Sequence, residues 1–218
     1  MNAIDILSGE EIQAVLEDLN TRLLRSVNSW QNLVIFRLSC CCGLRAKEIC
    51  GLNLRDVIAG GSMPAITIRQ GITKGKDGCR KARSIPLWWD KGTRKDIAKW
   101  FHHRIAETNG DLDQPFVCSQ SSGSNGKRLT EDLVAKRWRT AIRILSDDRV
   151  RQLHLHCGRH TFCSHSLAAG HSLVAVRDAA GHANIATTNI YLHYCERKEL
   201  PDTFSYKPDS FKTKKKEK

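Results

Sequence analysis

The segment His156-Cys-Gly-Arg-His-Thr-Phe162 places a histidine and an arginine three residues apart in a stretch with helical spacing. Residues at positions i and i+3 share one face of a helix, so a single pocket can hold His156 and Arg159 together. A guanidinium there can bind two phosphate oxygens at once, and an imidazole beside it can transfer a proton. Because such a pair more often forms a solvent-exposed helix face, the segment alone leaves the chemistry open.

Three further segments carry residue types that suit phosphate chemistry. In chain order they are Cys42-Gly-Leu-Arg-Ala-Lys-Glu-Ile-Cys-Gly-Leu52, Gly181-His182 and Thr188-Asn-Ile-Tyr191. Taken singly, each has an ordinary explanation. Tyr191 near the end of a domain is usually a core aromatic, and Arg45 can form an ion pair with Glu48 on the same helical turn. The information lies in their joint order and spacing, because a match of every segment by chance is far rarer than a match of one.

The order and spacing of these segments resemble the tyrosine recombinase, or phage integrase, family. That family shows a G-L-R-x-x-E-[LI]-x-x-L box, a lysine in a β-hairpin, an H-x-x-R-[HY]-[TS]-F box, a G-H pair and a tyrosine within T-x-x-Y. The resemblance covers roughly residues 8–196. It implies the fold of the family's catalytic domain, which is mostly α-helical with a small antiparallel β-sheet.

The resemblance also implies a role for each matching side chain. Arg45 and Arg159 would clamp the scissile phosphate and neutralise the charge that grows on its oxygens in the transition state. His156 would be the acid/base partner of the nucleophile, and His182 would hydrogen-bond the phosphate. Tyr191 would attack, leaving a 3′-phosphotyrosyl link and a free 5′-hydroxyl.

The general acid for the leaving 5′-oxygen is expected in a β-hairpin. Strand-like segments at residues 65–69 and 82–87 flank a Gly- and Lys-rich stretch at 71–81, which predicts a hairpin with a polar loop. The family's lysine lies near the first strand of its hairpin, which favours Lys74. Lys76 is the alternative, since most lysines in such a loop are simply solvated.

Helical spacing surrounds the hairpin on both sides. The capping box Ser8-Gly-Glu-Glu11 predicts a helix that continues to about Arg25. Further helices are predicted over residues 30–42, 45–51, 90–108, 130–145, 156–169, 172–180 and 185–194, and a short strand over 115–118. We expect residues 1–200 to form the catalytic domain and residues 201–218 to form a basic, flexible tail.

The composition favours a soluble protein that binds a polyanion. Lys and Arg total 35 against 23 Asp and Glu, a net charge of +12, and each cation that neutralises a phosphate releases counterions. No apolar run approaches the roughly 18 residues that a membrane span requires, and residues 1–10 lack the features of a signal peptide. We therefore expect double-stranded DNA as the partner, no membrane and a cytoplasmic location. The resemblance adds a tetramer on paired DNA sites.

Neither a metal ion nor another cofactor is predicted. The chain has nine Cys without a C-x-x-C motif, and the cluster of His154, His156 and His160 lacks acids or a second Cys at ligand spacing. The resemblance implies that arginines neutralise the phosphate in place of a metal. It also implies that the phosphotyrosyl link keeps the energy of the phosphodiester bond, so that ATP is not needed. A metal-dependent nuclease is a weak alternative.

Two other functions are compatible with the same residues. A type IB topoisomerase uses this chemistry without a specific site or a tetramer, and a regulatory DNA-binding module of recombinase descent would lack catalysis. The presence of all six expected catalytic residues argues against the second. Typical family members carry a core-binding domain before the catalytic domain, whereas here seven residues precede the first predicted helix. The chain is therefore expected to be either a short, one-domain member or a fragment.

Gly158 departs from the family's pattern, in which an apolar residue usually precedes the second arginine. A glycine inside a helix costs about 1 kcal/mol relative to alanine. We therefore expect this turn to be either loosened or unusually closely packed. Cys42 also stands where threonine is commoner, and neither change removes a catalytic group.

We expect DNA cleavage by the chain to persist in excess EDTA, because the cations that would act on the phosphate are side chains. The measurement is single-turnover cleavage of a nicked DNA substrate with and without the chelator. Loss of cleavage in EDTA that is restored by Mg²⁺ or Zn²⁺ would indicate a metallonuclease instead.

Overall fold

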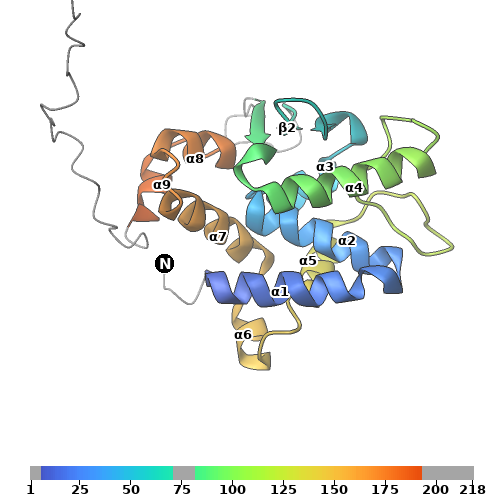
Figure 1. Ribbon diagram of the computed structural model, residues 1–218, viewed down its shortest axis with the longest axis horizontal. Helices are drawn as coiled ribbons and strands as arrows, with labels where there is room; N and C mark the ends of the chain where they lie inside the picture. The colour runs from blue at the N-terminus through green and yellow to red at the C-terminus, as the bar shows by residue number, and fades with distance from the viewer. Residues whose placement is uncertain (1–5, 71–81, 193–218) are drawn as a thin grey trace, which may run out of the picture.

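Helices form most of the protein in the computed structural model, which describes residues 6–70 and 82–192 (Figure 1). In chain order the helices are α1 (Gly9–Arg22), α2 (Val27–Phe36), α3 (Ala46–Gly51), α4 (Lys91–Glu107), α5 (Glu131–Ala141), α6 (Asp147–Gln152), α7 (Leu155–Ala168), α8 (Leu173–Ala180) and α9 (Ala186–Asn189). A small antiparallel sheet has the order β1-β2-β3, formed by β1 (Val57–Ile58), β2 (Ala65–Ile68) and β3 (Arg83–Pro86). The expected fold class, mostly α-helical with a small antiparallel sheet, is confirmed.

The sheet contains the two strands that the sequence predicts. β2 and β3 pair antiparallel, with Ile66 opposite Ile85. β1 joins the other edge of β2 and is not predicted, because two residues are too few to show a pattern. The stretch at 71–81, with both candidate lysines, and the proposed tail at 201–218 lie outside the described residues.

Local capping chemistry fixes the start of α1. The Ser8 hydroxyl accepts a hydrogen bond from the Glu11 N–H at 3.1 Å, and the Glu11 carboxylate accepts one from the Ser8 N–H at 2.8 Å, so the capping box is confirmed. A 3₁₀ turn continues α1 to Arg25.

Two predicted elements need correction, and one helix is not predicted. The strand predicted over 115–118 is wrong, because its ends form only isolated bridges, Pro115 with Asn53 and Cys118 with Arg128. Over the described part of the helix predicted at 185–194, α9 covers only Ala186–Asn189, and residues 193–194 lie outside the described residues. α6 is not predicted at all, because a helix of six residues has little periodicity to detect.

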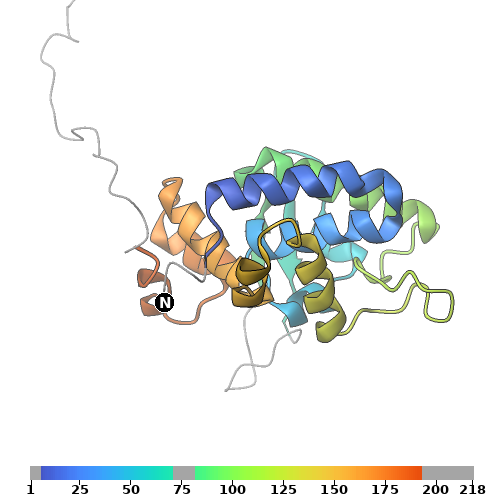
Figure 2. The same cartoon turned by 90° about the horizontal axis from the view of Figure 1, so that it is seen from below.

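Helices α7, α8 and α9 gather at one side of the molecule, and the far end of α4 lies at the other (Figures 1 and 2). The buried apolar residues form a large cluster that includes α2 and a smaller one on the α7–α9 side. The smaller cluster contains Phe162, Cys163, Val176 and Tyr191. The candidate nucleophile therefore belongs to a local apolar core. Within the described parts of the chain, no helix has both the length and the apolar character to cross a membrane.

Gly158 is closely packed, which decides between the two expectations for this turn. The chain forms a π-helical turn over Arg37–Cys41, and this turn lies against α7. The Ser39 hydroxyl donates a hydrogen bond to the Leu155 carbonyl at 3.1 Å. A Cβ at Gly158 would overlap that hydroxyl and approach Cys40 Sγ to 3.0 Å. The glycine thus allows the start of α7, which carries the candidate residues His156 and Arg159, to approach the π-helical turn.

Substituting Gly158→Ala should destabilise the fold, although alanine is the better helix former. Overpacking a well-packed interior typically costs about 1–3 kcal/mol, which exceeds the gain of roughly 1 kcal/mol from helix propensity. Urea unfolding measures the difference. Gly123→Ala is the control, because a Cβ there meets no atom within 4 Å. A Gly158→Ala protein as stable as its parent would contradict the close packing.

Candidate active site

Arg45 lies immediately before α3, and the turn that precedes it requires a glycine. Gly43 has a φ of +69°, a conformation that side chains other than glycine rarely adopt. A Cβ there would also approach the Phe162 ring, with Cγ at 2.9 Å. This turn brings the chain from the buried π-helical turn to the start of α3, where the Arg45 side chain is 23% exposed.

Glu48 is the fully buried partner that holds Arg45. Its carboxylate accepts hydrogen bonds from the Arg45 N–H at 2.9 Å and from Arg45 Nη1 at 3.0 Å. It also accepts two from Arg83 on β3, each at 2.8 Å. Burial alone would raise the pKa of Glu48, but the hydrogen bonds and charge of Arg83, followed by those of Arg45, hold the pKa below its ordinary value. One ionised carboxylate therefore orients two arginines.

Arg159 connects the segments on either side of the site. Its side chain is among the largest fully buried ones, with the residue 1% exposed. Nη1 donates to the Gly43 carbonyl at 2.7 Å, and Nη2 donates to the Ala180 carbonyl. Burial, followed by the positive charge of Arg45, lowers the pKa of Arg159 to about 10. The group is still a cation at neutral pH, and the structure brings the two predicted arginines together.

Tyr191 follows α9 and its side chain is buried, with the residue 2% exposed. Its hydroxyl lies 2.7 Å from His160 Nδ1, a hydrogen-bonding distance. Its ring stacks with the His182 ring at a centroid distance of 6.2 Å. Burial and the neighbouring Cys163 raise the pKa of Tyr191, and the charges of Arg159 and Arg45 act against this rise. The hydroxyl is therefore protonated and hydrogen-bonded in this arrangement.

His160 is the contact that the sequence analysis missed. It follows Arg159 directly and was assigned no role there, although it stands one helical turn after His156 on α7. The His156 and His160 rings meet edge to face with centroids 4.7 Å apart. The i, i+4 spacing of the two histidines was the available signal, because it places both on one helix face.

His156 and His182 are neutral at physiological pH. Burial, followed by the charges of Arg159 and Arg45, lowers the pKa of His156. The same causes, in the same order, lower the pKa of His182 to about 3. His182 follows Gly181, whose φ of +69° ends α8, and its Nδ1 lies 2.8 Å from Thr188 Oγ1. Neutral imidazoles can accept protons, which suits acid/base chemistry.

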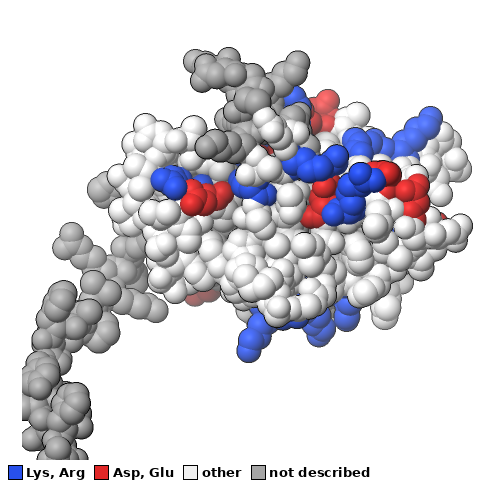
Figure 3. Space-filling view, turned by 90° about the horizontal axis from the view of Figure 1, so that it is seen from above, with Lys and Arg blue, Asp and Glu red and all other residues white. Residues whose placement is uncertain are grey.

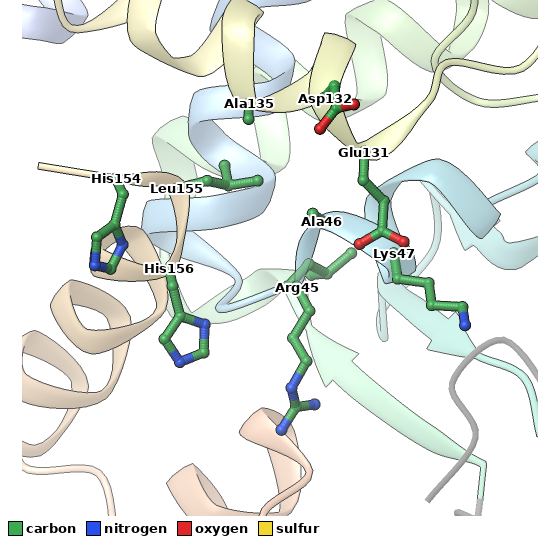
Figure 4. Close-up of a pocket in the computed structure, with 10 residues that line it drawn as sticks. Arg45, Ala46, Lys47, Glu131, Asp132, Ala135, His154, Leu155 and His156 are labelled. Carbon is green, nitrogen blue, oxygen red and sulfur yellow. The ribbon is translucent and has the colours of Figure 1, made fainter.

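A hollow of about 560 Å³ opens beside Arg45 and His156. Figure 4 shows both side chains extending away from α5, with Glu131 and Asp132 at the opposite edge of the hollow. The remaining lining comes mainly from the starts of α3 and α7. The face in Figure 3, where it is not covered in grey, shows Lys and Arg beside Asp and Glu rather than one continuous basic patch.

Metal ligands do not cluster in the described parts of the chain. Within residues 6–70 and 82–192, no group of three or more His, Cys, Asp or Glu is arranged to hold a metal ion. The seven cysteines in these ranges are free thiols.

Comparison with known proteins identifies relatives. The model of the phage integrase family matches residues 5–197. The tyrosine recombinase XerC of Pseudomonas aeruginosa (strain LESB58) is 33% identical over 152 residues, which cover 69% of this chain and 43% of the relative. XerC of Chromobacterium violaceum is 35% identical over 158 residues, or 72% of this chain and 46% of the relative. The chain thus spans less than half the length of these curated relatives.

Solved structures of low sequence identity share the fold. The crystal structure of XerA recombinase matches with a TM-score of 0.65 and 21% identity, over 90% of this chain and 61% of XerA. XerH site-specific recombinase, in a post-cleavage complex with the palindromic difH substrate, matches with a TM-score of 0.64 and 22% identity, over 88% of this chain and 50% of XerH. A lambda integrase dimer bound to a COC′ core site matches with a TM-score of 0.57 and 16% identity, over 93% and 63% of the respective chains.

Substituting Glu48→Gln should cost roughly 3–5 kcal/mol of stability at neutral pH, because breaking a buried ion pair leaves the partner charges uncompensated. Glu48 has a folded-state pKa below the ordinary 4.5, so its contribution is present above pH 4.5 and is lost as the pH falls through the folded-state pKa. The stability difference between parent and variant should therefore shrink in acid.

Urea unfolding at pH 7 and at several pH values below 4.5 measures this difference. The control is Asp148→Asn, which removes an exposed ion pair with Arg151 on α6 and should have little effect. A cost for Glu48→Gln that does not depend on pH would mean that the carboxylate charge does not stabilise the fold.

Proposed function

Since the chain belongs to the phage integrase family, we propose that it is a site-specific DNA recombinase that cuts and rejoins strands through Tyr191. The observation that carries this proposal is the convergence of two arginines, two neutral histidines and the tyrosine where α3, α7, α8 and α9 meet. These side chains come from segments far apart in the sequence. Their types match what cleavage of a phosphodiester by a tyrosine requires.

The two arginines would supply the electrostatic stabilisation. A phosphate bound beside Arg45 would gain negative charge on its non-bridging oxygens as Tyr191 attacks, and fixed guanidinium groups stabilise that charge without reorganising. Glu48 and the carbonyls of Gly43 and Ala180 hold these groups in place before DNA arrives. Such preorganisation favours the transition state over the ground state.

The proton of Tyr191 needs an acceptor. A tyrosine whose pKa is raised reacts poorly as a nucleophile at neutral pH unless a base takes its proton during the attack. The neutral His156 would serve as this base, and the hydrogen bond between Tyr191 and His160 offers a second acceptor next to it. Because Tyr191 is only 2% exposed, its hydroxyl must become more accessible before it can reach a DNA phosphate.

The remaining steps follow from the same chemistry. The attack forms a 3′-phosphotyrosyl bond and breaks the bond to the 5′-oxygen, which takes a proton from Lys74 or, alternatively, from Lys76. The phosphotyrosyl bond keeps the phosphodiester energy, so rejoining by a 5′-hydroxyl needs neither ATP nor a metal ion. His182 would hydrogen-bond the phosphate throughout.

We also propose double-stranded DNA as the partner, a tetramer on two paired sites as the active assembly, and the cytoplasm as the location. The net charge of +12 supports binding to a polyanion. XerH and lambda integrase, which share the fold, are described in complexes with difH substrate and a COC′ core site, respectively.

The chain should form a covalent adduct with DNA that maps to Tyr191. The substrates are nicked duplexes built on short inverted repeats from the DNA flanking the coding region, designed so that the 5′-hydroxyl fragment diffuses away. Tyr191→Phe should abolish the adduct and leave DNA binding nearly intact, because the ring still packs and only the hydroxyl is lost. The adduct is detected on denaturing gels and located by peptide mapping.

Two further arms test the assigned roles. Arg45→Ala and Arg159→Ala should each slow cleavage by about 10²–10³-fold, as loss of one oxyanion donor typically does. Cleavage by Lys74→Ala should recover on a substrate whose leaving oxygen is sulfur, which needs no general acid. Recovery of Lys76→Ala instead would transfer this role to Lys76. An adduct that survives Tyr191→Phe would overturn the proposal.

A further inference from the structure

Arg83, at the start of β3, forms contacts beyond its ion pair with Glu48. Its side chain is 11% exposed. Nη1 and Nη2 each donate to one oxygen of the Glu48 carboxylate at 2.8 Å, and Nε donates to the Ala179 carbonyl at 2.9 Å. All three guanidinium nitrogens therefore donate hydrogen bonds, Nη1 and Nη2 to α3 and Nε to the end of α8.

One partner of Arg83 contacts a residue of the proposed site directly, and the other is the chain neighbour of a residue that does. Glu48 holds the Arg45 side chain. Ala179 precedes Ala180, whose carbonyl accepts a hydrogen bond from Arg159. Arg83 also lies against Gly181, where an added Cβ would come within 2.8 Å of its Nε. Arg83 thus fixes three elements at one point: the strand that leaves the hairpin, the start of α3, and the turn that leads to His182.

The charges give Arg83 a second effect. Glu48 carries one negative charge and faces two guanidinium groups, so the group of three has a net charge of +1. Without Arg83, the carboxylate would fully neutralise Arg45, and the attraction of this group for a phosphate would fall. With Arg83 in place, Glu48 can orient Arg45 without cancelling its charge.

We infer that Arg83 is a positioning residue for DNA cleavage, which acts by fixing Arg45 and the His182 turn and by balancing the charge of Glu48. This inference rests on the proposed function. It concerns a residue that would not touch the reacting atoms and acts through Glu48 and the last turn of α8. The competing explanation is that Arg83 only stabilises the fold.

Arg69 provides a control for that explanation, with a side chain that is more exposed than that of Arg83, 43% against 11%. It too is an arginine beside the sheet that pairs with a buried carboxylate, with Nε 2.7 Å from Asp56 Oδ1 and Asp56 3% exposed. It also donates to a main-chain carbonyl, that of Gly51. Its partners Asp56 and Gly51 lie outside the proposed site. A purely structural role would therefore make Arg83→Gln and Arg69→Gln alike in their effect on cleavage.

The experiment compares Arg83→Gln, Arg83→Lys, Arg69→Gln and Arg45→Ala with the parent chain. Urea unfolding and DNA binding are measured first, and cleavage rates are then measured under conditions where each protein is folded and saturated with DNA. Each protein is given two nicked substrates, one with a normal scissile phosphate and one with an uncharged methylphosphonate at that position. The second substrate removes the negative charge that Arg45 would neutralise.

On the normal phosphate, Arg83→Gln should cleave about 10–100-fold more slowly than Arg69→Gln, because small misplacements of catalytic groups cost up to about 10²-fold. Arg83→Lys should fall between Arg83→Gln and the parent, since it keeps the charge but loses the fork. On the methylphosphonate, the deficits of Arg83→Gln and Arg45→Ala should both become smaller.

Equal cleavage by Arg83→Gln and Arg69→Gln would overturn the inference, as would a deficit of Arg83→Gln that is the same on both substrates. If Arg83→Gln does not fold, Arg83→Lys replaces it. Its cleavage rate is then compared with that of Arg69→Gln, and its deficit on the normal phosphate is compared with its deficit on the methylphosphonate. Failure of the proposed function would look different, because the parent would then form no adduct with either substrate or Arg45→Ala would cleave as fast as the parent.

Discussion

The buried guanidinium of Arg159 is the constraint on which the rest of the site depends. A charge with 1% exposure is costly to remove from water unless fixed partners replace the hydration that it loses. The partners are carbonyls of Gly43 and Ala180, which lie on opposite sides of Arg159 in the sequence. Movement of either segment would leave the charge unpaired. Arg159 therefore holds the start of α3 and the end of α8 together.

An excess of positive charge follows from this arrangement. Three arginines and one buried carboxylate, Glu48, meet at the centre of the site. Burial, followed by the charges of Arg159 and Arg45, lowers the pKa of His156 and His182 and keeps both rings neutral. Arg159 and Arg45 also oppose the rise in the pKa of Tyr191 that burial causes. Neutral imidazoles beside these cations can accept protons.

The position of Tyr191 reflects a balance between apolar packing and chemistry. Its ring packs in the smaller apolar cluster, and its hydroxyl is hydrogen-bonded to His160. Both interactions stabilise the protonated, buried side chain. Reaction with DNA would exchange them for contacts with a phosphate and the arginines. The short α9 and the turn after Gly181 are the elements that would have to move, because they connect Tyr191 to the body of the domain.

The sequence by itself determined the fold class, the antiparallel pairing of β2 with β3, the start of α1 and the identity of the candidate catalytic side chains. These depend on capping residues, on alternation along the strands, and on the order and spacing of motifs along the chain. Only the tertiary structure decided that His160 contacts Tyr191, that Arg83 shares Glu48 with Arg45, and that Gly158 is required by close packing. Some of these contacts join residues that lie far apart along the chain. Others depend on which element packs against a given face of a helix. The i, i+4 spacing of His156 and His160 indicates a shared helix face but not the partner of that face, because burial and the partners of a buried charge are fixed only when distant segments meet.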